Sequence, residues 1–167
     1  MTPNRSSARV RGPRVRSGVP EDAEAIAALI NQAFIVERVA FDGDRTNPNE
    51  IRALMTDGAF LLAEHTGALA ACVYVQVRGE RSYLGLLSVA PDQQGKGLGR
   101  ILVNAAEDFS RSAGCRAIDL RIISPRAEAL LPFYRRLGYS EAGTAPFPVY
   151  VTVKVPCHYV LMSKSLT

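Results

Sequence analysis

The chain has 167 residues, of which 47% are hydrophobic and 22% are charged, and its formal net charge is +4. This length and composition predict one globular domain, and no apolar run approaches the roughly 20 residues that a membrane-spanning helix needs. Five arginines and no acid lie within residues 1–16, whereas the rest of the chain has 15 basic and 16 acidic residues. The positive charge therefore belongs to the N-terminus and does not predict a nucleic-acid-binding domain.

The N-terminal segment differs in composition from the rest of the chain. We expect residues 1–13 to form a basic, flexible tail and residues 14–167 to form the domain. A transit peptide is the alternative, but Pro3, Gly12 and Pro13 interrupt any amphipathic helix, and the segment contains no apolar secretory core. We therefore expect a soluble, cytoplasmic protein.

The cysteines and histidines are few and do not have metal-ligand spacing. Cys72, Cys115 and Cys157 form neither an even set nor a C-x-x-C motif, which favours reduced thiols. His65 and His158 are the only histidines. We predict no metal site.

The first third of the chain predicts two helices. Val19–Asp22 is typical of a helix start, because proline suits the first helical position and acids favour the positive end of the helix dipole. Apolar residues then recur at helical spacing from Ile26 to Phe34. A polar loop over residues 42–49 precedes a short predicted helix over residues 50–55, which stops near residues 57–58.

The middle of the chain predicts an antiparallel meander. Its three strands cover residues 60–64, 69–77 and 83–89. The turn signals are His65-Thr66-Gly67 and Arg78-Gly79-Glu80-Arg81.

The remainder of the chain alternates helices and strands. The predicted helices cover residues 98–109 and 128–137, and glycines at positions 114 and 138 end them. We expect Pro132 to distort the first turn of the second of these helices. The predicted strands cover residues 117–123, 139–143 and 157–164, with a proline-rich connection over residues 145–156.

A glycine-rich turn over Val89–Arg100 joins a predicted strand to a predicted helix. Gly95, Gly97 and Gly99 remove side chains that would keep a ligand from the backbone. The N–H groups of the first helical turn have no partner inside the helix and attract anions. The turn therefore predicts a site for a diphosphate.

Spacing separates three kinds of anion-binding turn. A P-loop needs a hydroxyl residue after its lysine, but Lys96 precedes Gly97 and Leu98. A dinucleotide fingerprint would need glycine at Arg100 or at Leu102. The third kind fits: Gln94-Gly95-Lys96-Gly97-Leu98-Gly99 matches Q/R-x-x-G-x-G/A and closely resembles the pyrophosphate loop of the GNAT superfamily of N-acetyltransferases.

Two more segments carry the resemblance. Gly85–Val89 resembles the fourth strand of the family, and Phe133–Tyr139 resembles its later F-Y-x-x-x-G-[F/Y] element. The order and spacing agree from about Val15 to the C-terminus. The resemblance implies an α/β (α+β) fold with a central mixed, mostly antiparallel sheet of about six to seven strands and about four helices.

The resemblance also implies where the co-substrate acetyl-CoA binds. Pantetheine would pair with the edge of the strand at residues 83–89, which splays from the strand at residues 117–123. The pyrophosphate would bind at the glycine-rich turn. The implied cofactor-binding residues are Leu87, Ser88, Val89, Gln94, Gly95, Lys96, Gly97, Leu98, Gly99 and Arg100.

Tyr134 is the implied catalytic residue, because the matching family position commonly holds a tyrosine that protonates the departing thiolate of coenzyme A. The backbone N–H of Val89 is the implied oxyanion donor. The general base is open: residues 82–89 contain no acid, and Glu64, Asp119 and a chain of waters are alternatives. Both acids can instead be interpreted as surface charges at the ends of strands.

The expected function is transfer of acetyl from acetyl-CoA to a primary amine by direct attack. The alternative is a non-catalytic acyl-CoA-binding or regulatory module with the same fold. The expected partner is a small-molecule or peptide amine, and no membrane is expected. A nucleic-acid acceptor is disfavoured, although the arginines of residues 1–16 leave a nucleic-acid-directed acetyltransferase as a third alternative. A homodimer could form through a strand edge at residues 157–164. The sequence does not identify the acceptor; we expect its determinants in residues 34–57 and 145–156.

Overall fold

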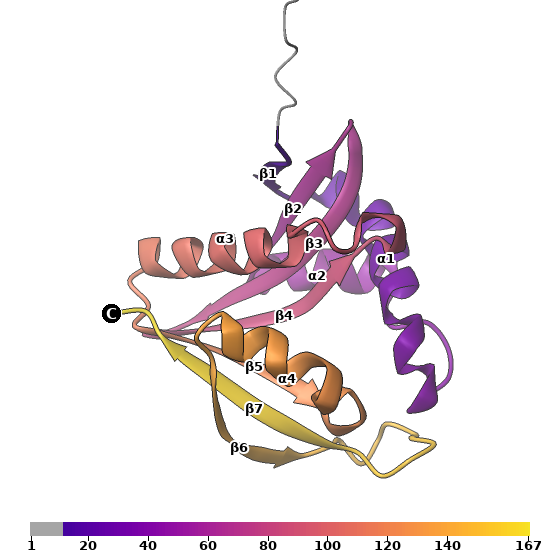
Figure 1. Ribbon diagram of the computed structural model, residues 1–167. Helices are drawn as coiled ribbons and strands as arrows, with labels where there is room; N and C mark the ends of the chain where they lie inside the picture. The colour runs from indigo at the N-terminus through magenta and orange to yellow at the C-terminus, as the bar shows by residue number, and fades with distance from the viewer. Residues whose placement is uncertain (1–11) are drawn as a thin grey trace, which may run out of the picture.

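The computed structural model describes residues 12–167, and it has a central seven-stranded sheet in the order β1-β2-β3-β4-β5-β7-β6 (Figure 1). The strands are β1 (Arg14–Ser17), β2 (Ala59–His65), β3 (Ala68–Arg78), β4 (Arg81–Val89), β5 (Ala117–Ile123), β6 (Ser140–Pro146) and β7 (His158–Ser165). Only the β4–β5 pair is parallel. The predicted mixed, mostly antiparallel sheet is confirmed.

Four α-helices and four short 3-10 helices connect the strands. The α-helices are α1 (Ala23–Ala33), α2 (Pro48–Asp57), α3 (Leu98–Ser112) and α4 (Ala127–Arg136). The 3-10 helices are η1 (Pro20–Asp22), η2 (Phe34–Val39), η3 (Pro91–Gln93) and η4 (Ser124–Arg126). None of the helices in residues 12–167 is long and apolar enough to cross a membrane.

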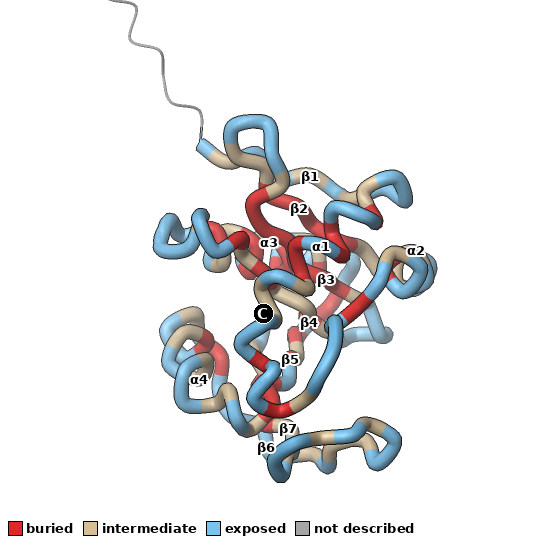
Figure 2. The backbone as a smooth tube through the Cα atoms, turned by 90° about the vertical axis from the view of Figure 1, so that its right-hand side faces the viewer, coloured by how far each residue is buried: buried red, intermediate tan, exposed pale blue. Residues whose placement is uncertain are grey.

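The helices cover both faces of the sheet, and strand alternation decides which residues they cover. Phe60 and Leu62 of β2 pack against α1 and α2, whereas Leu61 and Ala63 pack in the cluster that contains α3 and Tyr134 of α4. Successive side chains of a strand point to opposite faces, so β2 contributes to both cores. Figure 2 shows the buried segments gathered along the inner strands and the helix faces that cover them.

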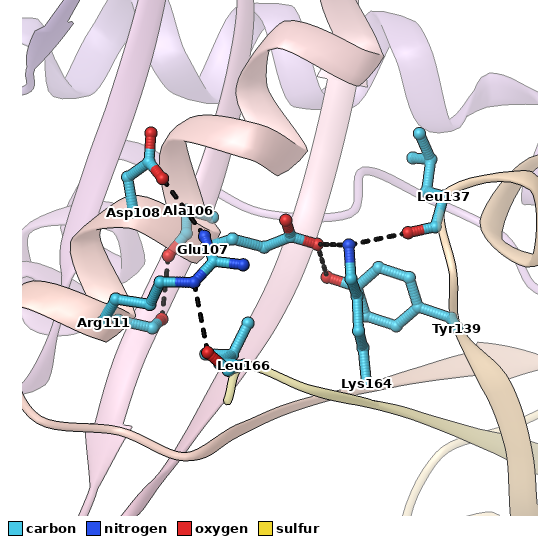
Figure 3. A network of polar contacts seen from close by, with 9 residues as sticks. Ala106, Glu107, Asp108, Arg111, Leu137, Tyr139, Lys164 and Leu166 are labelled. Carbon is cyan, nitrogen blue, oxygen red and sulfur yellow. Dashed lines mark hydrogen bonds and ion pairs between the residues drawn. The ribbon is translucent and has the colours of Figure 1, made fainter.

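A buried polar cluster joins α3 to the C-terminal part of the sheet (Figure 3). Glu107 of α3 accepts hydrogen bonds from Lys164 Nζ at 2.8 Å and from the Tyr139 hydroxyl at 3.1 Å. Lys164 Nζ also donates to the backbone oxygen of Leu137 at 2.8 Å. The cluster ties β7 and the end of α4 to α3.

The observed elements differ from the predicted ones at several boundaries. The strand β1 was not predicted, because its four residues include two arginines and it is an exposed edge strand. The helix α2 starts earlier than expected, at Pro48, because the Asn47 side chain accepts a hydrogen bond from Glu50 N at 3.0 Å and caps it. The expected distortion at Pro132 is wrong: α4 begins at Ala127 and continues through Pro132, which lies beyond its first turn, and the separate 3-10 helix η4 precedes it.

The expected strand edge at residues 157–164 is wrong. The strand β7 lies between β5 and β6, so both of its edges are paired within the sheet. The two edge strands are β1 and β6. The predicted tail at residues 1–13 lies mostly outside the described residues, and Gly12 and Pro13 lead directly into β1.

The strands β4 and β5 pair only at their beginnings. Arg81–Tyr83 pair with residues 117–119, and β4 then leaves β5. Opposite β3, the pairing of β4 shifts register between Tyr74 and Cys72, and Leu86 has a φ of 54° at this bulge. A bulge bends a strand and increases its twist, which separates the rest of β4 from β5.

Candidate active site

A cavity of about 680 Å³ opens where β4 and β5 separate. Its walls come from β4, β5, η2, α4, the loop after η2 and the loop between β6 and β7. The lining includes Glu37, Phe41, Tyr83, Leu87, Arg121, Phe133, Tyr134, Phe147, Tyr150 and Tyr159. The two segments in which we expected acceptor determinants, residues 34–57 and 145–156, both contribute to this lining.

The glycine-rich turn leads into the N-terminus of α3. Gly95 and Gly97 both have a φ of +79°, and a Cβ added at either would meet nothing within 4 Å. The first backbone bond into the helix runs from Ile101 N to Gly97 O at 3.1 Å. The N–H groups of the helical residues before Ile101 therefore lack an intrahelical acceptor and lie at the positive end of the dipole. This arrangement fits a diphosphate.

The third glycine of the turn lies beside α4. A Cβ at Gly99 would lie 3.4 Å from Phe133 Cζ, which is van der Waals contact, so the structure does not require glycine at this position. Gln94, Lys96 and Arg100 are exposed, and Lys96 Nζ donates to the Gln93 side chain at 3.2 Å. Leu98 is buried and anchors the first turn of α3 in the core.

The three predicted residues of β4 have different environments. Leu87 lines the cavity, whereas the Ser88 side chain is buried and donates to Leu86 O at 2.9 Å. Ala90 N bonds to Ala70 O of β3 at 2.8 Å. Because backbone groups alternate in direction along a strand, the N–H of Val89 points away from β3 toward the gap beside β5.

Tyr134 is buried in α4 and lines the cavity. Its ring packs edge-to-face against Phe133 and Tyr139, with centroid distances of 5.0 and 5.8 Å. Burial raises the pKa of the Tyr134 hydroxyl, so the group stays protonated at neutral pH. No hydrogen bond from any residue between 12 and 167 engages that hydroxyl.

The acids considered as bases from the sequence lie elsewhere. Glu64 forms an ion pair with Arg16 at 2.7 Å, and Asp119 binds Arg81. The hydrogen bond from Arg81 holds the pKa of Asp119 below its ordinary value. Neither acid lines the cavity, which agrees with their interpretation as charges at strand ends rather than as the base.

Glu37 lines the cavity and was not among the predicted site residues. Its residue is 9% exposed, and desolvation raises the pKa of its carboxyl, with Arg45 and Arg126 opposing the shift. A signal was present, because Glu37 continues the helical spacing of Ile30 and Phe34, where a further apolar residue is expected.

An aromatic wall completes the cavity. Phe41 stacks on Phe147 with centroids 6.0 Å apart, and Phe147 lies 5.0 Å from Tyr159. The Arg121 guanidinium carbon lies 4.5 Å from the Tyr159 ring centroid and 5.5 Å from that of Tyr83. Tyr83 and Tyr150 also line the cavity, and Tyr150 is exposed.

A splayed β4–β5 pair, with a glycine-rich helix N-terminus beside it, defines a transferase of the GNAT fold. The model of the acetyltransferase (GNAT) family matches residues 24–139. The chain belongs to this family and is an acetyl-CoA-dependent N-acetyltransferase.

Three known proteins illustrate the similarity. Streptothricin acetyltransferase of Streptomyces lavendulae is 29% identical over 77% of this chain and 82% of its own length. An aminoglycoside N(6')-acetyltransferase of Stenotrophomonas maltophilia is 31% identical over 77% and 87%. A Salmonella typhimurium protein whose structure holds its cofactor acetyl-CoA has a TM-score of 0.74 at 21% identity, covering 94% of this chain and 95% of the other.

Proposed function

We propose that this protein acetylates a primary amine of a small molecule inside the cavity between β4 and β5, with Tyr134 as the general acid. The edge of β4 at Leu87–Val89 would bind pantetheine, and the turn from Gln94 to Arg100 would bind the pyrophosphate. The observation that carries the proposal is the unpaired Tyr134 hydroxyl at the point where β4 and β5 separate.

The unpaired edge of β4 supports the placement of pantetheine. Beyond Tyr83 the side of β4 that faces β5 has no strand partner. Amide groups of pantetheine can bond to such an edge as an added strand does. This edge leads directly to the turn that fits the diphosphate, so one extended ligand reaches both.

The chemistry needs a positioned thioester, an oxyanion donor and two proton movements. The amine nitrogen forms a bond to the acetyl carbon while the C–S bond breaks, the nitrogen loses one proton and the sulfur gains one. The Val89 N–H would stabilise negative charge on the acetyl oxygen. The Tyr134 hydroxyl would protonate the sulfur, and burial favours its protonated form.

The acceptor class is supported by the relatives and by the cavity. The relatives in Streptomyces lavendulae and Stenotrophomonas maltophilia are named for streptothricin and for aminoglycosides. A cavity of about 680 Å³ is of the size that binds small ligands. We therefore propose amine-bearing antibiotics and related small polyamines as the first acceptors to assay.

A panel of amines with a readout of released coenzyme A thiol tests the transfer reaction. The panel should include streptothricin, aminoglycosides, simple alkylamines and diamines. We expect thiol release with at least one cationic amine and a product that is heavier by one acetyl group. Binding of acetyl-CoA without turnover of any amine would contradict the proposal.

A matched pair of glycine variants tests the diphosphate site. Gly97→Glu places a negative charge at the turn, whereas Gly67→Glu makes the same change at a hairpin glycine that also has a φ of +79° and open space around it. Both variants carry similar backbone strain. Acetyl-CoA at about 100 times its Kd should stabilise the unaltered protein and Gly67→Glu by about 2.7 kcal/mol, but not Gly97→Glu. Equal shifts in all three would overturn the placement.

A further inference from the structure

The short helix η2 exposes its aliphatic residues and buries its acid. Ile35, Val36 and Val39 are exposed, by 49%, 52% and 61%, whereas Glu37 between them is 9% exposed. Apolar side chains normally turn inward and carboxylates outward. A segment that buries its only acid and exposes three aliphatic residues gains nothing for folding from that choice, so the position of Glu37 points to a ligand.

Glu37 is also the unpaired acid of the cavity. Asp42 forms an ion pair with Lys154 at 2.6 Å, and Asp44 lies 3.9 Å from Arg38. Within the described part of the chain, no ion pair or hydrogen bond is made to the Glu37 carboxylate. Desolvation outweighs the favourable charges of Arg45 and Arg126 and raises the pKa of the Glu37 carboxyl, so a cationic ligand that reached this carboxylate from the cavity would stabilise its charged form.

Two guanidiniums and a thiol lie near Glu37. The charges of Arg45 and Arg126 favour its charged form. Burial and, to a lesser degree, the Glu37 carboxylate raise the pKa of the Cys157 thiol. The wall of Phe41, Phe147 and Tyr159 lines the same cavity. Aromatic faces and a desolvated carboxylate together form the environment that binds organic ammonium groups.

We propose that Glu37 binds an ammonium group of the acceptor and thereby makes the enzyme selective for amines that enter as cations. This inference rests on the proposed transfer reaction in the same cavity. The ammonium is either that of the reacting amine or a second one on a polyamine. If it is the reacting group, its proton passes to the Glu37 carboxylate, and the neutral amine then attacks the thioester.

The test compares Glu37→Gln with the unaltered enzyme on three acceptors of similar length: an alkyl diamine, an alkyl monoamine and an amine of low pKa that is neutral at pH 7. We expect KM for the diamine to rise at least tenfold, with KM for acetyl-CoA unchanged. A similar rise in KM for the monoamine, with a changed pH profile, would show that Glu37 binds the reacting ammonium. A rise in KM for the diamine alone would show that Glu37 binds the second ammonium. In both cases the neutral amine is affected less than twofold.

Two further variants keep the test specific. Glu37→Asp retains the charge on a shorter side chain and should recover at least part of the lost affinity. Glu24→Gln removes an exposed charge that already pairs with Arg52 and does not line the cavity, so KM should change less than twofold. Glu37→Gln should retain the stabilisation by acetyl-CoA, which shows that the variant is folded.

The outcomes separate the two proposals. Turnover by the unaltered enzyme together with unchanged KM values in Glu37→Gln overturns the role of Glu37 and leaves the transfer reaction in place. Equal losses for charged and neutral amines also overturn it, because they indicate a general defect of the cavity. Absence of turnover with every amine overturns the transfer proposal itself.

Discussion

Two buried glutamates in this protein have opposite surroundings. Glu107, which is 4% exposed, accepts from Lys164 and from Tyr139, so its charge is compensated (Figure 3). Glu37 is 9% exposed and has no such partner in the described residues. The first carboxylate joins α3 to β7, whereas the second faces the cavity.

Two tyrosines of one aromatic cluster repeat this contrast. The rings of Tyr134 and Tyr139 lie 5.8 Å apart, and both side chains are buried. The Tyr139 hydroxyl donates to Glu107, whereas the Tyr134 hydroxyl has no hydrogen-bond partner within residues 12–167 and its residue borders the cavity. The Tyr134 oxygen is not fully buried, so a ligand in the cavity can reach it. We expect the pairing state to separate residues that hold the fold from residues of the site.

The largest expected effect is a loss of stability when the Glu107 carboxylate is removed. Glu107→Gln leaves the Lys164 ammonium without a carboxylate, and we expect the free energy of unfolding to fall by about 3 kcal/mol. For a domain of this size that corresponds to a melting temperature lower by roughly 6–12 °C. The neighbouring variant Asp108→Asn breaks only an exposed contact to Arg111 and should change stability by less than about 0.5 kcal/mol. Equal effects would show that the buried cluster does not stabilise the fold.

The two tyrosines give the second test. Tyr134→Phe should lower kcat about 100-fold, because the thiolate loses its proton donor, while the melting temperature stays nearly unchanged. Tyr139→Phe should do the reverse, with kcat retained and stability lowered by about 1.5 kcal/mol, because Glu107 loses a hydrogen bond. Steady-state kinetics and thermal unfolding of both variants measure the contrast. A normal kcat in Tyr134→Phe would refute its role as the acid.

The stability of Glu37→Gln tests the contrast between Glu37 and Glu107. Arg45 and Arg126 compensate the desolvated charge of Glu37 only in part, so its removal should raise the free energy of unfolding by up to about 1 kcal/mol in the absence of ligands. This change is opposite in sign to that in Glu107→Gln. A loss of stability in the Glu37 variant, measured by denaturant unfolding, would show that its carboxylate has a structural partner.

The smallest expected effect is the pH dependence of the stability difference between the unaltered protein and Glu37→Gln. The pKa of Glu37 is raised above its ordinary value of 4.5 by burial, so the folded protein binds this proton more tightly than the unfolded chain does. The group therefore destabilises the fold progressively as pH rises from about 4.5 through the raised pKa. The free energies of unfolding of the unaltered protein and Glu37→Gln should be close at pH 4 and should diverge by no more than about 1 kcal/mol toward pH 7. A constant difference would exclude titration of Glu37 as its cause.

Most of the fold was predictable because its signals are local. Turn residues at Thr66 and Gly67 and the apolar periodicity of α3 predict their elements without tertiary information. The strand β1 was missed because its pairing with β2 is non-local and its residues are charged. The order of β7 and β6 was also missed, since strand length and composition do not specify which neighbour a strand takes.

The sequence by itself predicted a diphosphate site, because a glycine turn before a helix depends on local backbone chemistry, and its resemblance to the GNAT family at this turn and at Phe133–Tyr139 predicted the class of enzyme. The tertiary structure decided which acid enters the cavity. Glu64 and Asp119 meet arginines from other strands, and Glu37 is turned inward by η2. The charge state and the partners of a side chain depend on residues distant in sequence, and these meet only when the sheet has assembled.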